Sequence, residues 1–225
     1  MGKAWLGLMD MYFLELLNGS NSLFLDRFAV AFTTGYTWIP FYVSLAVLVV
    51  RNNKTMGQIM LVFGCVLLGV LASGLLSDFI VKPYFMRPRP CYDPATRHLV
   101  HTVAGYSASG YSFFSSHAAN TMMLAVFVTL LVRGKVLSSV LIVWSLLNAW
   151  TRLYLGVHWF TDVGAGLLWG AVVGVLAYLL YFFVTPREKY ISSRYTGTGY
   201  DKNDIDVCLS IMMLTVIYCF FRVLI

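Results

Sequence analysis

Residues 163–184 of the chain read VGAGLLWGAVVGVLAYLLYFFV and contain no charged side chain. A helix that crosses a bilayer needs about 20 mostly apolar residues, so this stretch predicts a membrane-spanning helix. The composition of the whole chain agrees, since 59% of its 225 residues are hydrophobic and only 12% are charged. A soluble domain has about 25% charged residues and could not bury this much apolar surface. We therefore expect an integral membrane protein.

Five further apolar runs without a charged residue flank this stretch. They cover residues 28–50, 55–77, 117–132, 136–151 and 207–221, and the second continues beyond its uncharged part to about residue 81. No polar stretch is long enough to build a second core. We predict one domain, residues 1–225, folded as an all-α polytopic membrane helix bundle of about six transmembrane helices. Within the run 163–184, Gly166, Gly170 and Gly174 recur at a four-residue spacing that lets helices pack closely.

The N-terminal residues do not form a good signal peptide, because Asp10 and Glu15 interrupt what would be its apolar region. We predict instead an amphipathic helix over about residues 4–18 that lies at the membrane interface. Partial entry of this helix into the bilayer is the alternative.

Strict alternation of the spans brings residues 81–116 and 152–162 to one face of the membrane. Cytoplasmic loops carry an excess of Lys and Arg. With Lys82, Arg89 and Arg152 set aside, this face carries five such residues, Lys3, Arg27, Arg87, Arg97 and Arg222. The opposite face carries eight, Arg51, Lys54, Arg133, Lys135, Arg187, Lys189, Arg194 and Lys202. The bias predicts that the first face lies outside the cytoplasm, in the periplasm or at the cell exterior.

Charge and cysteine content exclude several classes of protein. The net charge of +6 comes without a basic run, which indicates anionic headgroups or an anionic substrate rather than nucleic acid. The four cysteines are scattered and form no CxxC pair, so neither a zinc site nor a disulfide framework is supported.

Residues 82–90 read KPYFMRPRP and interleave three cations with three prolines. Proline fixes φ and ends helices, so Lys82, Arg87 and Arg89 are expected on a stiffened exit from the preceding span. Arg offers a planar fork of donors that suits phosphate, and Lys offers a point charge. The alternative is a positive flank that touches lipid headgroups.

Residues 114–120 read FSSHAAN and precede an apolar run. Serine is a good N-cap, and the free N–H groups of a helix N-terminus suit an anion. Ser115 and Ser116 are therefore candidate phosphate contacts, and His117 is expected in the first turn, where it points at whatever binds there. Simple capping beside an interfacial histidine is the alternative.

Residues 151–162 read TRLYLGVHWFTD and place a cation, an imidazole and a carboxylate between two apolar runs. On a helix, positions i and i+4 share a face, so the Asp162 carboxylate can reach the His158 ring. A carboxylate on one ring nitrogen leaves the other as a nucleophile. The alternative is a structural pair, although ionisable groups in membrane spans are costly and are by default functional.

The three stretches together supply what phosphoryl transfer through a phosphohistidine needs. Lys82, six residues and Arg89-Pro90 match the first signature of the type 2 phosphatidic acid phosphatase (PAP2) superfamily. Ser115-Ser116-His117 resembles its second, Pro-Ser-Gly-His, and Arg152, five residues, His158, three residues and Asp162 match its third. The departures are Phe114 for Pro, Ser116 for Gly and Thr151 for the Ser that usually opens the third signature.

The resemblance implies a role for each matching residue. His158 would attack phosphorus, Asp162 would orient it, and His117 would protonate the leaving oxygen. Family members work without a metal, so no cofactor is expected. Arg87 lies outside the signatures and is a candidate headgroup contact. The phosphate would be held by Lys82, Arg89, Arg152, Ser115 and Ser116.

The predicted activity is hydrolysis of a lipid monophosphate or diphosphate in a bacterial inner membrane. The resemblance favours undecaprenyl diphosphate or lipid A phosphate as the substrate. A transporter or receptor that binds phosphate without hydrolysis is the alternative, as is a structural bundle with a dead site. Only the enzyme needs two histidines and an Asp behind one of them.

The polar loop between Cys91 and Phe114 also carries Tyr92, Tyr106, Tyr111 and Phe113. Tyrosine sits well at a membrane interface because its ring is apolar and its tip is polar. We expect this loop, helped by the N-terminal helix, to cover the phosphate site and grip the first carbons of a lipid chain, with simple anchoring of the loop as the alternative.

Overall fold

The computed structural model describes residues 2–20, 22–103, 106–185 and 199–224, and every regular element in these ranges is helical. The prediction of an all-α membrane bundle is thereby confirmed. In chain order the elements are α1 (Gly2–Leu17), α2 (Leu23–Thr33), the 3₁₀ turn η1 (Gly35–Trp38), α3 (Ile39–Asn52), α4 (Met56–Val70), the π-helical turns η2 (Leu71–Leu75) and η3 (Ser77–Val81), α5 (Lys82–Phe85), α6 (Ser116–Val132), α7 (Lys135–Tyr154), α8 (Phe160–Val184) and α10 (Lys202–Leu224).

Four helices in the described ranges are long and apolar enough to cross a membrane: the continuous helix Met56–Phe85, α7, α8 and α10. The predicted run 28–50 is not one straight helix, because the chain bends by 67° between α2 and the stretch Gly35–Asn52. Thr34 takes an extended conformation there, and Pro40 lies in the first turn of α3. If the bent pair counts as one span, five qualify, and α6 is a shorter apolar helix of 17 residues. A total of six spans stays a prediction.

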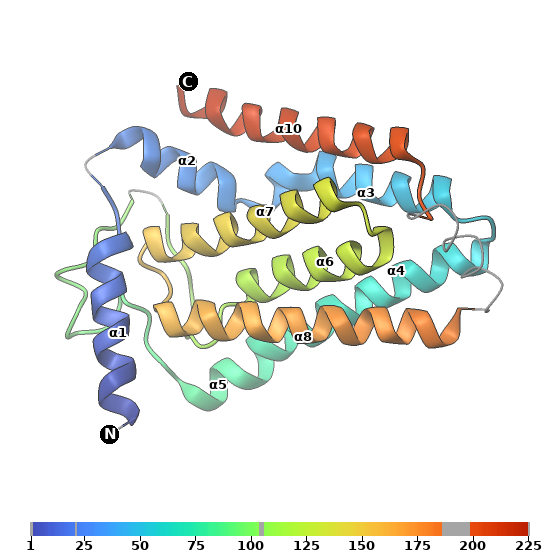
Figure 1. Cartoon of the computed structure of the whole chain (residues 1–225). Coiled ribbons are helices and arrows are strands. Elements are labelled where there is room, and N and C mark those ends of the chain that lie inside the picture. Colours follow the sequence, from blue (N-terminus) through green and yellow to red (C-terminus); the bar gives the residue numbers. More distant parts are fainter. Residues whose placement is uncertain (1, 21, 104–105, 186–198, 225) are drawn as a thin grey trace.

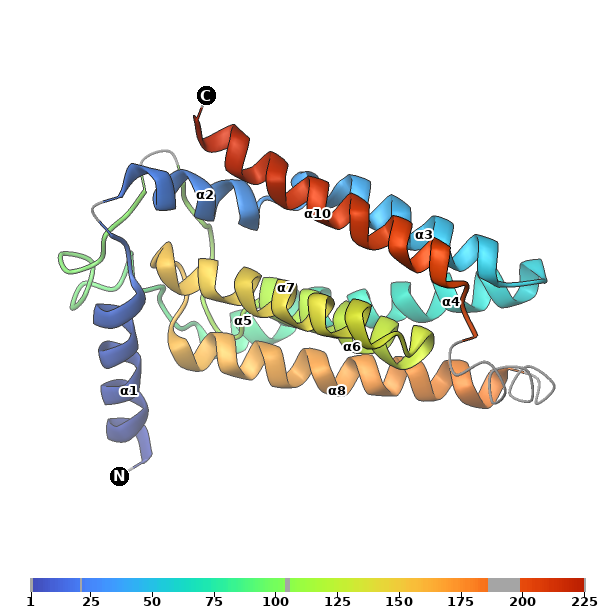
Figure 2. The same ribbon diagram turned by 45° about the horizontal axis from the view of Figure 1, so that its top comes forward.

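Helix α6 lies at the centre of the bundle, between α7 and α8 and against α4 (Figures 1 and 2). The glycine stripe of α8 allows the closest of these approaches. A Cβ atom at Gly166 would lie 2.5 Å from the carbonyl oxygen of Ser115, and one at Gly170 would lie 2.2 Å from that of Ala119. Gly174 makes the same kind of contact one turn further on. The prediction that this stripe serves helix packing is confirmed.

The two segments expected on one membrane face lie together at one end of the bundle (Figures 1 and 2). The Ser115 N–H donates to the Asp162 carbonyl oxygen at 3.1 Å, so the first turns of α6 and α8 are joined directly. Helix α1 crosses the same end, at a steep angle to the bundle, and contacts α7 and α8. Its place relative to a membrane interface stays a prediction.

Candidate active site

A polar cleft of about 600 Å³ opens at this end of the bundle. Its wall is formed by the helix ends at 82, 116 and 152, by the loop 106–111 and by the connection at 158. It brings together six of the nine site residues expected from the sequence, namely Lys82, Arg89, Ser116, His117, Arg152 and His158.

His158 follows the turn after α7 and is only 2% exposed. Its Nε2 lies 3.1 Å from Nη1 of Arg89, and its Nδ1 lies 3.6 Å from Oδ2 of Asp162. Because a guanidinium can only donate, Nε2 is the ring nitrogen with the lone pair, and Nδ1 carries the proton on the Asp162 side. Burial and the nearby cations Arg152, Arg89 and Lys82 lower the pKa of His158 well below its usual range. The ring is therefore neutral, with the lone pair of Nε2 toward Arg89.

Asp162 is fully buried behind His158 and does not line the cleft. Its Oδ2 accepts from the backbone N–H of Trp159 at 3.0 Å, and its Oδ1 accepts from Nη1 of Arg87 at 2.6 Å. The first bond caps α8, and the negative carboxylate also interacts favourably with the positive end of the helix dipole. The spacing of the two residues thus brings the carboxylate beside the imidazole, although 3.6 Å is slightly longer than a hydrogen bond.

Arg89 is buried, and its hydrogen bonds connect the segments that form the wall of the cleft. Its Nε donates to the Gly110 carbonyl oxygen at 3.0 Å, and its Nη2 donates to that of Ser109 at 2.8 Å. Its Nη1 donates to the Val157 carbonyl oxygen at 2.8 Å as well as facing His158. Four of its five donors are thus engaged, so Arg89 orients the loop and the His158 ring as well as adding positive charge.

Arg152 is 2% exposed and contacts Thr33 and Tyr106. Its guanidinium lies over the Tyr106 ring, 5.5 Å from the ring centre, and its Nη1 donates to the Tyr106 hydroxyl. Within the described residues its buried Nε has no hydrogen-bond partner. A buried donor without a partner is costly. Tyr106 and Tyr111 both line the cleft, as the covering role of their loop requires.

Asp78 is a cleft residue that the sequence analysis missed. Its Oδ1 pairs with Nζ of Lys82 at 2.5 Å and accepts from the Ser116 hydroxyl at 3.0 Å. Lys82 also donates to the Ser116 hydroxyl at 3.0 Å, which closes a triangle. The available signal was a carboxylate four positions before Lys82 at the end of an apolar run.

His117 lies in the first turn of α6, is exposed, and lines the cleft. The helix starts where the serines predicted. Ser115 is its N-cap and accepts from the Ala118 N–H at 3.5 Å, and Ser116 is its first residue. Ser115 is fully buried and does not line the cleft, so its hydroxyl serves the helix rather than a ligand.

Arg87 does not line the cleft either, and its assignment as a headgroup contact stays a prediction. Its guanidinium is held between Asp10 of α1 and Asp162, and lies 5.2 Å from the centre of the Trp159 ring. Two ion pairs and an aromatic face direct it behind the site.

Known proteins resemble this chain in sequence and in fold. The chain is 33% identical over 180 residues to the lipid A 4'-phosphatase of Bacteroides thetaiotaomicron, covering 80% of each chain. It is 27% identical over 114 residues to the undecaprenyl-diphosphatase BcrC of Bacillus subtilis, covering 51% of this chain and 55% of the relative. The fold resembles the crystal structure of Aquifex aeolicus LpxE with a TM-score of 0.57 and 21% identity, covering 74% of this chain and 93% of that one.

The chain forms a helical membrane bundle, and its polar cleft contains three cations and two histidines. This combination is typical of a membrane-embedded phosphatase. The family model of the PAP2 superfamily matches residues 61–186, which is more than half of the chain. The chain belongs to the PAP2 superfamily.

Proposed function

We propose that the protein removes phosphate from a membrane lipid at the non-cytoplasmic face, through a phosphohistidine on His158. The observation that carries the proposal is the His158 ring, held neutral, with Asp162 on one side and the cationic cleft on the other. A transporter or receptor would need the cations but not an imidazole with a carboxylate behind it.

The proposed reaction has two steps. Nε2 of His158 attacks phosphorus and forms an N–P bond while the P–O bond to the lipid breaks, and His117 gives a proton to the departing oxygen. Water then attacks the same phosphorus, His117 takes a proton from it, and the N–P bond breaks to release inorganic phosphate. Lys82, Arg89 and Arg152 would stabilise the charge that builds on the phosphoryl oxygens. Within the described residues no three His, Cys, Asp or Glu side chains gather to hold a metal ion; independence from metal stays a prediction.

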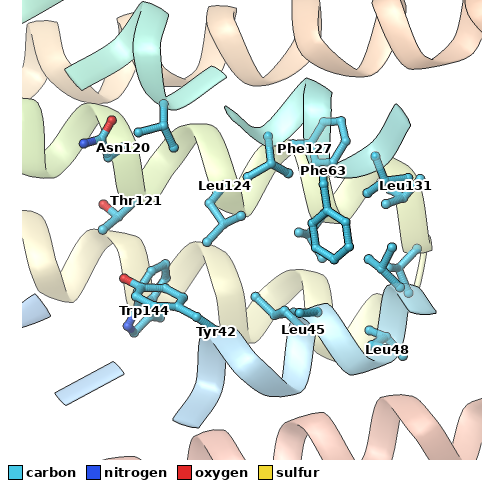
Figure 3. Close-up of a pocket in the computed structure, with 17 residues that line it drawn as sticks. Tyr42, Leu45, Leu48, Phe63, Asn120, Thr121, Leu124, Phe127, Leu131 and Trp144 are labelled. Carbon is cyan, nitrogen blue, oxygen red and sulfur yellow. The ribbon is translucent and has the colours of Figure 1, made fainter. Parts of the chain in front are cut away.

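An apolar cavity of about 370 Å³ supports a lipid substrate. Figure 3 shows it between α3, α4, α6 and α7, with Asn120 and Thr121 at one end and Leu131 and Leu48 at the other. Asn120 and Thr121 lie three and four positions after His117 on α6, so they share its helix face. A hydrocarbon chain could occupy this cavity while its phosphate lies one helical turn away in the cleft.

We favour a lipid A phosphate over undecaprenyl diphosphate. The similarity to the lipid A 4'-phosphatase is higher and covers 80% of this chain, whereas that to the undecaprenyl-diphosphatase covers 51%. The test is phosphate release by the detergent-purified protein from lipid A phosphates, undecaprenyl diphosphate, phosphatidylglycerol phosphate and phosphatidic acid, side by side. We expect the highest kcat/KM on a lipid A phosphate and no turnover by His158→Ala. Turnover of undecaprenyl diphosphate alone would contradict the proposed lipid A substrate. Binding of all four lipids without turnover would favour a receptor.

The proposed sidedness has its own test, because the charge bias rests on eight cations against five. In a background without native cysteines, Ala95→Cys on the exposed surface of the cleft-end loop should react in intact cells with a membrane-impermeant thiol reagent. Lys202→Cys, at the start of α10 and also exposed, should not react. The reverse labelling pattern would mean that the cleft faces the cytoplasm.

A further inference from the structure

Asp10 of α1 is 1% exposed although it is charged. Each of its oxygens has a partner. Oδ1 accepts from the Thr161 N–H at 2.9 Å, and Oδ2 accepts from the Thr161 hydroxyl at 2.9 Å and from Nη2 of Arg87 at 2.5 Å. A buried carboxylate is tolerated only when it is paired and hydrogen-bonded, and Asp10 meets both conditions.

The same guanidinium continues to the proposed catalytic pair. Nη1 of Arg87 donates to Oδ1 of Asp162 at 2.6 Å, and Asp162 in turn lies 3.6 Å from Nδ1 of His158. Nη1 also donates to the Thr161 hydroxyl at 2.8 Å. Two carboxylates from distant parts of the chain thus share one planar donor group, which fixes the orientation of all three.

The rest of α1 is fastened to the same end of the bundle. Phe13 stacks on Phe160 with ring centres 3.9 Å apart, and Leu14 is buried beside Trp159. Asn18, just after the helix, donates to the Tyr154 carbonyl oxygen at 2.8 Å. Helix α1 therefore contacts the chain on both sides of His158.

We propose that Asp10 and Arg87 are positioning residues that make α1 part of the catalytic apparatus, an inference that rests on the proposed phosphohistidine function. Asp10 holds Arg87 against Asp162, which leaves the Asp162 Oδ2 directed at Nδ1 of His158. When Nε2 attacks phosphorus, the ring gains positive charge, and the net negative cluster Asp10–Arg87–Asp162 stabilises that charge.

The first test is Asp10→Asn in purified protein assayed on the preferred lipid phosphate. We expect kcat to fall about tenfold with KM within about twofold, because misplacement of a catalytic group affects the chemical step more than binding. Glu15→Gln is the matched control, since it changes an exposed carboxylate to an amide in the same helix, and we expect it to leave both constants unchanged.

The second test separates positioning from a structural role. Arg87→Gln removes the cation between the buried carboxylates of Asp10 and Asp162, so we expect a larger loss of kcat. We also expect the acid limb of the pH–rate profile to move to higher pH, because neighbouring negative charges favour the protonated form of a carboxyl group. Adding Asp10→Asn removes one of the two charges. The double variant should be more active than Arg87→Gln alone and should bring the acid limb back.

Unchanged kcat in Asp10→Asn, or a loss that only follows the fraction of folded protein, would overturn the inference. So would a double variant less active than Arg87→Gln. Full activity of His158→Ala would instead overturn the proposed function, which keeps the two failures distinct.

Discussion

At the scale of single residues, the protonation of His158 decides whether the site can work. Its low pKa, caused by burial and by the surrounding cations, predicts a ring that stays neutral as the pH falls below 6.5, the usual value for histidine. The unfolded chain binds that proton more tightly, so the free energy of unfolding should fall as the pH drops through this range.

Nitrogen NMR of histidine-labelled protein in micelles measures this directly. The His158 resonances, assigned by their loss in His158→Gln, should keep the pattern of a neutral ring at pH 5.5. Protonation of the His158 ring between pH 7 and pH 5.5 would contradict the assignment of a neutral ring.

Asp78 adds a negative charge to a cleft that is also lined by the cations Lys82, Arg89 and Arg152. It neutralises part of the Lys82 charge, and 46% of its side chain remains exposed, so a second phosphate of a diphosphate would meet repulsion there. We predict that Asp78→Asn shifts the ratio of kcat/KM for diphosphate against monophosphate lipids about tenfold toward diphosphate, or about 1.4 kcal/mol. Matched lipids with one and two phosphates measure the ratio. An unchanged ratio would remove Asp78 from substrate selection.

At the scale of helices, the contact between α6 and α8 determines how closely His117 and His158 approach. A Cβ at Gly170 would lie 2.2 Å from a backbone oxygen, whereas one at Gly164 would meet nothing within 4 Å. We predict that Gly170→Ala lowers the thermal stability and the activity together, because α8 must move away from α6. Gly164→Ala should leave both unchanged or raise stability slightly, since alanine favours helix. Equal effects of the two changes, read from melting curves and kcat, would contradict this packing.

The sequence predicted these elements where the signal was local. Apolar length located most of the helices, and the serines located the start of α6. Asp162 lies beside His158 as the short separation suggested, although His158 precedes the N-cap of α8 and is not on its face. The bend near Thr34 was missed because an uninterrupted apolar run carries no sign of it. The contacts of Asp10 and of Arg87 were missed because they join segments up to 151 positions apart, as with Asp10 and Thr161. Asp78 was missed although its spacing from Lys82 is local.

At the scale of the whole molecule, the cleft and the apolar cavity lie on one face of α6 and would bind the two ends of one lipid. We predict that Leu124→Trp, which fills the cavity, lowers kcat/KM on a long-chain lipid phosphate at least tenfold, about 1.4 kcal/mol, but changes it less than twofold on a short water-soluble phosphate. Val143→Trp, at a 55% exposed position of α7, is the control and should affect neither. An equal loss on both substrates would mean that the cavity serves folding alone.

Rapid-quench labelling measures directly whether the phosphoryl group of the lipid passes to His158. Purified protein is mixed with lipid labelled with ³²P in its phosphate and quenched in alkali within the first turnover. We expect a protein-bound label that is stable in base, is lost in acid, maps to the peptide containing His158 and is absent from His158→Ala. Full turnover with no label on His158, or with His158→Ala still releasing phosphate at the normal rate, would contradict this expectation.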